Sequence, residues 1–341
     1  MKKAQAALAV LMIVLSLSVC VSAHVPQMIE GNDGIENAVH IDDPLKSWAY
    51  YSTFQTSDSV SYFQFHLEKG DRLWLSVFTP YIGDVHPDAV IIGPGIESEG
   101  ELPGGVDVLE NNGYIVIKGK APDTPTYEPF TPSANYQWFK FEYTAEVPGI
   151  YYIAMVNKGS GPGNYGVAIG YLEEFSISEW GLIPFSTANV HLWEGSGQMF
   201  VWGLPLFILL LGLLYLFRLK KEPVRIKLET VTGVTGGVLY LAGAASMLAQ
   251  ALFALSKTGF QPTFAVTAIF IAIPLILGIM ILRYYIRPDP KPVKYQGIKL
   301  VILGMVGLVF WAGYIIGPVL VIVSGVKFLI DTRSKTKKDS I

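Results

Sequence analysis

The residue of this sequence with the clearest potential for chemistry is His24. Small residues, Val21 and Ala23, occupy the positions that define a signal-peptide cleavage site, so cleavage would make His24 the first residue of the mature chain. Its α-amine and its imidazole could then bind one metal ion together, and this pair of nitrogen ligands suits copper. Further ligands would have to come from distant histidines such as His66 or His86. The alternative is that His24 merely follows the cleavage site in a flexible end.

The other polar residues show no pattern typical of catalysis. The chain has 5 histidines without ligand spacing, and it lacks the Gly-x-Ser-x-Gly, His-Glu-x-x-His, Walker and Gly-x-Gly-x-x-Gly motifs. The stretch Gly159–Gly163 lies between two strand patterns, which favours a hairpin loop over a phosphate site. Acidic pairs such as Asp42-Asp43 and Glu173-Glu174 are typical of a solvated face. A calcium site at Asn32-Asp33-Gly34 or Glu97–Glu101 is the alternative. We therefore predict no enzymatic activity and no cofactor.

Residues 1–23 are predicted to be a signal peptide. Lys2 and Lys3 precede an apolar segment, Ala4–Val21, which ends at the cleavage site. The alternatives are a retained anchor helix and a lipoprotein that uses Cys20. The chain has 1 cysteine, Cys20 itself, so a cleaved chain would contain neither disulfides nor cysteine-based zinc sites.

Charge divides the rest of the chain into two parts. Residues 24–200 contain 23 acidic and 7 basic residues, whereas residues 201–341 contain 16 basic and 5 acidic residues. A nucleic-acid-binding domain needs a basic globular face, so the acidic part is not expected to bind nucleic acid. Only 16% of all residues are charged, against about 25% in soluble proteins, which indicates membrane spans.

The acidic part, residues 24–196, has the pattern of an all-β domain. Apolar and polar residues alternate over Tyr62–Leu67 and Arg72–Val77, with a turn at Lys69-Gly70-Asp71 between them. Further short runs are separated by Gly and Pro, and we see no convincing amphipathic helix. Seven or eight such strands predict an antiparallel, jelly-roll-like β-sandwich.

The basic part, residues 197–330, is predicted to be a membrane region of about four helices. The four stretches that lack charged residues and histidine are 199–217, 231–255, 262–282 and 300–326. The first and third connecting loops are basic, so they are expected in the cytoplasm with residues 24–196 outside. Four full spans would place the basic tail, residues 331–341, outside as well. A re-entrant turn near Gly317-Pro318 would avoid this conflict, but a single tilted span is simpler and we favour it.

Two stretches of the β-domain resemble the bacterial pre-peptidase C-terminal (PPC) domains. These stretches, Ser61–Val77 and Ala145–Ala168, contain the patterns Tyr-Phe-x-Phe with Gly-Asp-Arg-Leu and Pro-Gly-x-Tyr-Tyr with Gly-Asn-Tyr. GOLD-type sandwiches are similar in outline. The resemblance covers roughly residues 35–171 and none of the spans. It implies a jelly-roll-like sandwich that accompanies secreted enzymes or acts as a binding module, although no peptidase is attached here.

Together these observations predict a non-enzymatic, multi-pass protein of the cell (plasma) membrane. Its acidic sandwich, residues 24–196, would bind a protein or a surface component outside the cytoplasm, while the lipid bilayer surrounds its helices. The alternative is an accessory subunit of a larger membrane complex, with metal handling through His24.

Overall fold

A computed structural model of the chain describes residues 24–219, 227–286 and 293–338. The predicted signal peptide, residues 1–23, lies outside the described residues, as do most of the first loop of the basic part and residues 287–292 of its third loop. The chain divides into two compact units: Met1–Gly195 with Lys257–Gly259, and Ser196–Ser256 with Phe260–Ile341. Each unit is described by itself.

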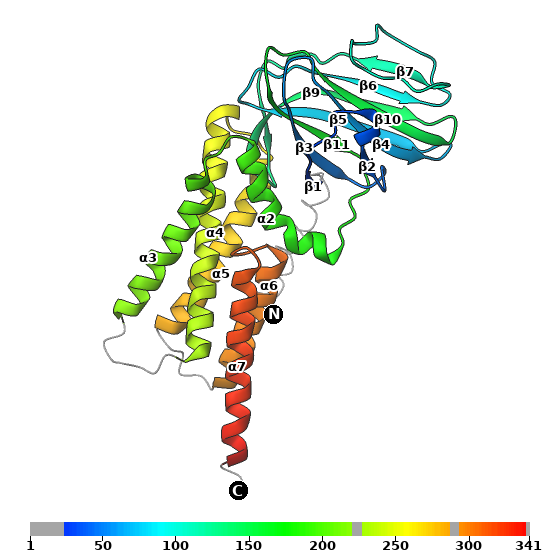
Figure 1. The fold of residues 1–341 in the computed structure, drawn as a ribbon. Helices are drawn as coiled ribbons and strands as arrows, with labels where there is room; N and C mark the ends of the chain where they lie inside the picture. The colour runs from blue at the N-terminus through cyan, green and yellow to red at the C-terminus, as the bar shows by residue number, and fades with distance from the viewer. Residues whose placement is uncertain (1–23, 220–226, 287–292, 339–341) are drawn as a thin grey trace. The chain divides into compact units, whose positions relative to one another are not determined.

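The first unit contains two β-sheets (Figure 1). In the described residues, one sheet has six strands in the order β1 (Val25–Met28), β3 (Trp48–Phe54), β11 (Gly163–Ile169), β5 (Arg72–Pro80), β9 (Ser133–Thr144) and β8 (Thr126–Glu128). The other has five strands in the order β2 (Val39–Ile41), β4 (Val60–Leu67), β10 (Gly149–Asn157), β6 (Pro87–Gly93) and β7 (Gly113–Ile117). We call them the six-stranded and the five-stranded sheet.

Alternation along the strands builds the main core. In β4, Phe63, Phe65 and Leu67 are fully buried in one cluster, together with Leu75 of β5 and Ile153 of β10. Because successive strand residues point to opposite faces, their neighbours form a second cluster: Val60, Tyr62, Val90, Ile92, Val106, Tyr152, Ala154 and Val156. The five-stranded sheet therefore buries apolar side chains on both of its faces.

The sandwich is confirmed in outline and differs in detail from the prediction. The described residues hold eleven strands in two sheets, where seven or eight were expected. The sheets are mixed, because β1 pairs in parallel with β3 and β2 pairs in parallel with β4. Both parallel strands come from residues 25–41, which contain no clear alternation and were not recognised as strands.

A helix inside the predicted β-domain is the main correction to its all-β class. The helix α2 (Ile177–Trp193) begins at Ser176 with a capping box, in which Ser176 and Glu179 bond each other's backbone N–H groups. Pro184 lies within the helix. This internal proline and the neighbouring Gly181 disfavour a helix locally, which explains why the pattern was missed.

The second unit is helical, and its expected number of about four membrane spans is corrected. Among residues 24–219, 227–286 and 293–338, two helices are long and apolar enough to cross a membrane: α4 (Leu228–Thr258) and α5 (Phe264–Ile286). They correspond to the expected spans 231–255 and 262–282. The expected span 199–217 is formed by η3 (Met199–Gly203) and α3 (Leu204–Leu219), which count as a shorter apolar helix.

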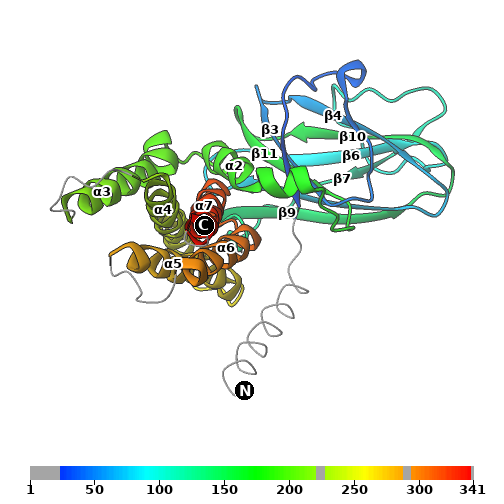
Figure 2. The same ribbon diagram turned by 90° about the horizontal axis from the view of Figure 1, so that it is seen from below.

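The expected fourth span, 300–326, is not one helix. It is divided between α6 (Val293–Val309) and α7 (Ile316–Lys338), which lie side by side in both views (Figures 1 and 2). A Cβ atom on Gly304 would lie 2.5 Å from Ile322 Cγ1, and one on Gly297 would lie 2.8 Å from the Gly325 carbonyl oxygen. These pairs define an antiparallel helical hairpin, so the favoured single tilted span is wrong.

Candidate functional site

His24 lies directly before β1 and contacts two side chains. Its Nδ1 is 2.5 Å from Ser47 Oγ, and its ring stacks on Trp74 with the ring centroids 6.1 Å apart. Burial lowers the pKa of His24 from 6.5 to about 4. The ring is therefore neutral at physiological pH, which is the form that binds metals. A histidine packed for structural reasons would have the same properties.

The other histidines each lie beside a carboxylate of their own: His40 with Asp42, His66 with Glu68, His86 with Asp84, and His191 with Glu194. Within the described part of the chain, no three His, Cys, Asp or Glu side chains gather closely enough to hold a metal ion. His66 and His86 therefore do not join His24 in a preformed site. Copper binding at the mature N-terminus stays a prediction.

The acidic and Gly-rich stretches have local structural roles. Asp43 Oδ1 accepts hydrogen bonds from the backbone N–H groups of Leu45 (3.0 Å) and Lys46 (3.2 Å). Asn32, from the predicted calcium loop, is buried and donates to the Tyr62 carbonyl at 3.3 Å. Asp43 therefore stabilises a turn of the backbone, and Asn32 is part of the packing of the domain.

The loop Gly159–Gly163 is not the expected hairpin. It joins β10 of the five-stranded sheet to β11 of the six-stranded sheet. Asn157 holds it, because its Nδ2 donates to the Gly161 carbonyl at 2.8 Å and its Oδ1 accepts from the Gly159 N–H at 2.9 Å. The loop crosses between the sheets, and the Gly159 N–H group is used within this turn.

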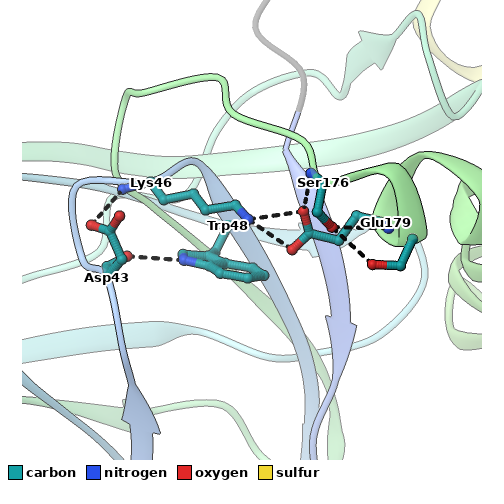
Figure 3. A network of polar contacts seen from close by, with 6 residues as sticks. Asp43, Lys46, Trp48, Ser176 and Glu179 are labelled. Carbon is teal, nitrogen blue, oxygen red and sulfur yellow. Dashed lines mark hydrogen bonds and ion pairs between the residues drawn. The ribbon is translucent and has the colours of Figure 1, made fainter.

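The N-terminal end of α2 is fastened to the sandwich by an ion pair (Figure 3). Lys46 Nζ bonds both carboxylate oxygens of Glu179, at 2.7 and 2.9 Å. Both side chains are largely shielded from solvent, with exposed fractions of 15% and 20%. Burial raises the pKa of Glu179, but the hydrogen bonds from Lys46 and Ser176 lower it by more, so the carboxylate is charged. Lys46 also lies 4.4 Å from the centre of the Trp48 ring.

The C-terminal end of α2 is fastened by Trp193. Its indole N–H donates to the Ser52 carbonyl at 2.8 Å, and its ring meets Tyr51 edge-on with centroids 4.9 Å apart. Phe78 also packs against the ring, at 6.1 Å, and Asn164 donates to the Trp193 carbonyl. Strands β3, β5 and β11 of the six-stranded sheet therefore all hold this end of the helix.

Beside Trp193 lies a group of shielded ionisable residues, Glu128, His191 and Glu194, which we call the carboxylate cluster. His191 Nδ1 is 3.1 Å from Glu194 Oε2, and the two side chains are only 4% and 9% exposed. Glu194 Oε1 has no hydrogen-bond partner among the described residues. Burial is the main cause that raises the pKa of Glu128 from 4.5 to about 7, and the charge of Glu194 raises it further.

The carboxylate cluster can hold a proton near neutral pH. Burial and the charges of Glu128 and Glu194 also raise the pKa of the Tyr51 hydroxyl, so Tyr51 stays neutral. Glu128 comes from β8, whereas His191 lies on α2 and Glu194 is the residue that directly follows this helix. Sequence reasoning missed this cluster, because Glu128 is more than sixty positions away from the other two residues and because the helix that ends beside them was not expected. The capping-box pattern Ser176-x-x-Glu179 is the signal that could have revealed the helix.

Comparison with protein-family models gives no match, and comparison with curated protein sequences gives none either. One solved structure with a limited likeness is described as "CorA is a surface-associated copper-binding protein important in Methylomicrobium album BG8 copper acquisition". It is 9% identical, with a TM-score of 0.22, and the match covers 45% of this chain and 98% of that chain. A likeness at this level carries no argument about fold or function, and the resemblance to PPC domains stays a prediction.

Proposed function

We propose that this chain is a non-enzymatic, multi-pass membrane protein that presents an acidic β-sandwich as a binding module outside the cytoplasm. The observation that carries the proposal is the charge division between the sandwich and the helices. Residues 24–200 have 23 acidic and 7 basic residues, and residues 201–341 have 16 basic and 5 acidic residues. Basic loops mark the cytoplasmic side of a membrane protein, and an acidic surface attracts cationic partners.

The attachment of α2 supports a module in which this helix is a fixed part of the sandwich domain. The ion pair between Lys46 and Glu179 fixes one end of the helix to the sandwich, and Trp193 fixes the other. The helical stretch Met199–Leu219 begins a few residues after Trp193. If this stretch, α4 and α5 each cross the membrane once, the sandwich lies outside and both basic loops lie in the cytoplasm.

Binding can be tested on the full chain reconstituted in vesicles, with an oligolysine peptide and an oligoglutamate peptide as probes. We expect binding of the oligolysine only, and weaker binding as salt is added. A variant with Glu97, Glu99 and Glu101 replaced by Gln should bind less, because these exposed carboxylates add to the acidic field. Equal binding of both probes, or turnover that one carboxylate substitution abolishes, would contradict the proposal.

The alternative, an accessory subunit with a metal at His24, has its own test. Protein purified in mild detergent would contain a stoichiometric membrane partner, or copper that is lost in His24→Ala. The Ser47→Ala variant is a useful control, because it removes the contact to His24 Nδ1 but leaves both nitrogen ligands in place.

A further inference from the structure

The helical hairpin of α6 and α7 has two apolar legs of nearly equal length. Between Lys299 and the end of α6 at Val309 lie about ten uncharged residues, and a similar number separates Ile316 from Lys327 on α7. Each leg is therefore roughly 15 Å long at about 1.5 Å per residue. The hydrocarbon layer is about 30 Å thick, so each leg reaches only its middle.

The turn between the legs is non-helical backbone. Trp311, Gly313, Tyr314 and Ile315 all have positive φ, between 47° and 63°. This conformation is unfavourable for a β-branched residue such as Ile315. Exposed polar backbone is not tolerated in lipid, so such a turn must be buried in protein or line a cavity.

Packing against α4 buries this turn. A Cβ atom on Gly313 would lie 2.8 Å from the Leu239 carbonyl carbon, and one on Gly243 would lie 3.2 Å from the Gly313 nitrogen. Leu239–Gly243 is close to the middle of α4, which has 31 residues. The turn therefore meets α4 near its middle, and the length of the legs likewise places the turn near the middle of the hydrocarbon layer.

The open end of the hairpin is bonded to the beginning of α4. Ser324 Oγ on α7 and the Tyr285 hydroxyl on α5 both donate to the Glu229 carbonyl, at 2.5 and 3.2 Å. Glu229 itself is 5% exposed. The hairpin is thus held at its turn and at its open end, and its open end lies at the same end of α4 as the first basic loop.

We infer that α6 and α7 form a re-entrant hairpin that enters and leaves the membrane on the cytoplasmic side, and that the basic end of α7 contacts anionic lipid headgroups there. This inference rests on the proposed function, which places the sandwich outside. After the apolar leg come Lys327, which pairs with Asp331, and then Arg333, Lys335, Lys337 and Lys338, and α7 continues to Lys338. The last turns of α7 extend past α6 in Figure 1. Basic segments at this position attract anionic lipids of the cytoplasmic leaflet.

Topology is tested with single cysteines in a Cys20→Ser background and a maleimide that does not cross membranes. We expect Lys120→Cys in the sandwich and Ser256→Cys in the last turn of α4, at the second loop, to react in intact cells. Lys221→Cys in the first loop and Ser340→Cys in the tail should react only after permeabilisation. Reaction of Ser340→Cys together with Lys120→Cys in intact cells would overturn the hairpin and leave the proposed function standing. Reaction of Lys120→Cys only after permeabilisation would overturn the proposed function instead.

Lipid contact is tested with a fluorophore on Ser340→Cys in the full chain, reconstituted with headgroup-quenching lipid. Adding phosphatidylglycerol to phosphatidylcholine vesicles should increase the quenching, and high salt should reverse the increase. Replacing Lys335, Lys337 and Lys338 by Gln should weaken this association about fivefold per lysine, whereas replacement by Arg should preserve it. Quenching that ignores phosphatidylglycerol, or that persists in the Gln variant, would overturn the contact with anionic lipid.

Discussion

From the carboxylate cluster we predict that the first unit loses stability as the pH rises toward neutral, and that the substitution Glu128→Gln removes this loss. The pKa of Glu128 is raised from 4.5 to about 7 in the folded chain, by burial first and by the charge of Glu194 second. Between these two values, Glu128 is protonated in the folded state and ionised in the unfolded state. Folding therefore takes up a proton, and the free energy of unfolding must fall as the pH rises from about 4.5 to about 7.

The size of this effect follows from the pKa difference. Each pKa unit corresponds to about 1.4 kcal/mol, so the full difference between 4.5 and about 7 corresponds to at most about 3.5 kcal/mol. Because the residue is only partly buried, we expect about 1–3 kcal/mol, or roughly 3–10 °C in the melting temperature of a domain of this size. Glutamine is neutral and keeps the shape, so Glu128→Gln should be more stable than the unmodified chain at pH 8 and similar to it at pH 5.

The assay is thermal unfolding of residues 24–195, followed by circular dichroism at several pH values. Glu110→Gln is the matched control, since Glu110 is exposed and its substitution should change neither the stability nor its pH dependence. If Glu128→Gln showed the same fall in stability between pH 5 and pH 8 as the unmodified domain, the effect would belong to other groups and the reasoning would be refuted.

Three further experiments test the packing of the first unit. In a double-mutant cycle, Lys46→Met and Glu179→Gln should show a coupling of about 1–2 kcal/mol, because the pair is doubly hydrogen-bonded and only 15% and 20% exposed. Additive single effects would contradict this. Because Trp193 is only half-buried, Trp193→Ala should cost about 2–3 kcal/mol in urea unfolding, which is less than for a fully buried tryptophan. Trp193→Phe should cost less still, because it keeps the ring contacts with Tyr51. Leu75→Asp should prevent folding, since Leu75 is 0% exposed, whereas Ile150→Asp, at a position 48% exposed, should give a cooperative melt.

The sandwich could be predicted because its central strands obey a local rule. The alternating residues of β4 and β5 divide cleanly between two apolar faces, so a period of two was visible in the sequence. The strands β1 and β2 were not visible, because each is short and gains its place by parallel pairing with β3 and β4. Such pairing depends on residues that are distant in the sequence.

The only candidate site residue that could be proposed from the sequence is His24, because its possible chemistry depends on its position at the predicted cleavage site. His24 was found because cleavage would place an α-amine beside an imidazole. The carboxylate cluster was not found, since neither Glu128 nor Glu194 differs in sequence from the many solvated carboxylates of this acidic domain. What sets them apart is burial in the folded chain and the effect of Glu194 on Glu128, and the helix α2, which ends next to Glu194, was not expected because of Gly181 and Pro184.

The segment 300–326 shows how two physical criteria can disagree and which one should be preferred. Its length and lack of charge favoured a single span, because a helix of this length exceeds the hydrocarbon thickness. The basic tail argued against that span, because it would have placed Arg333, Lys335, Lys337 and Lys338 outside. The length of an apolar segment does not distinguish a single span from a buried hairpin, because both are equally apolar. Charge at the ends constrains topology more strongly, and the break between α6 and α7 agrees with it.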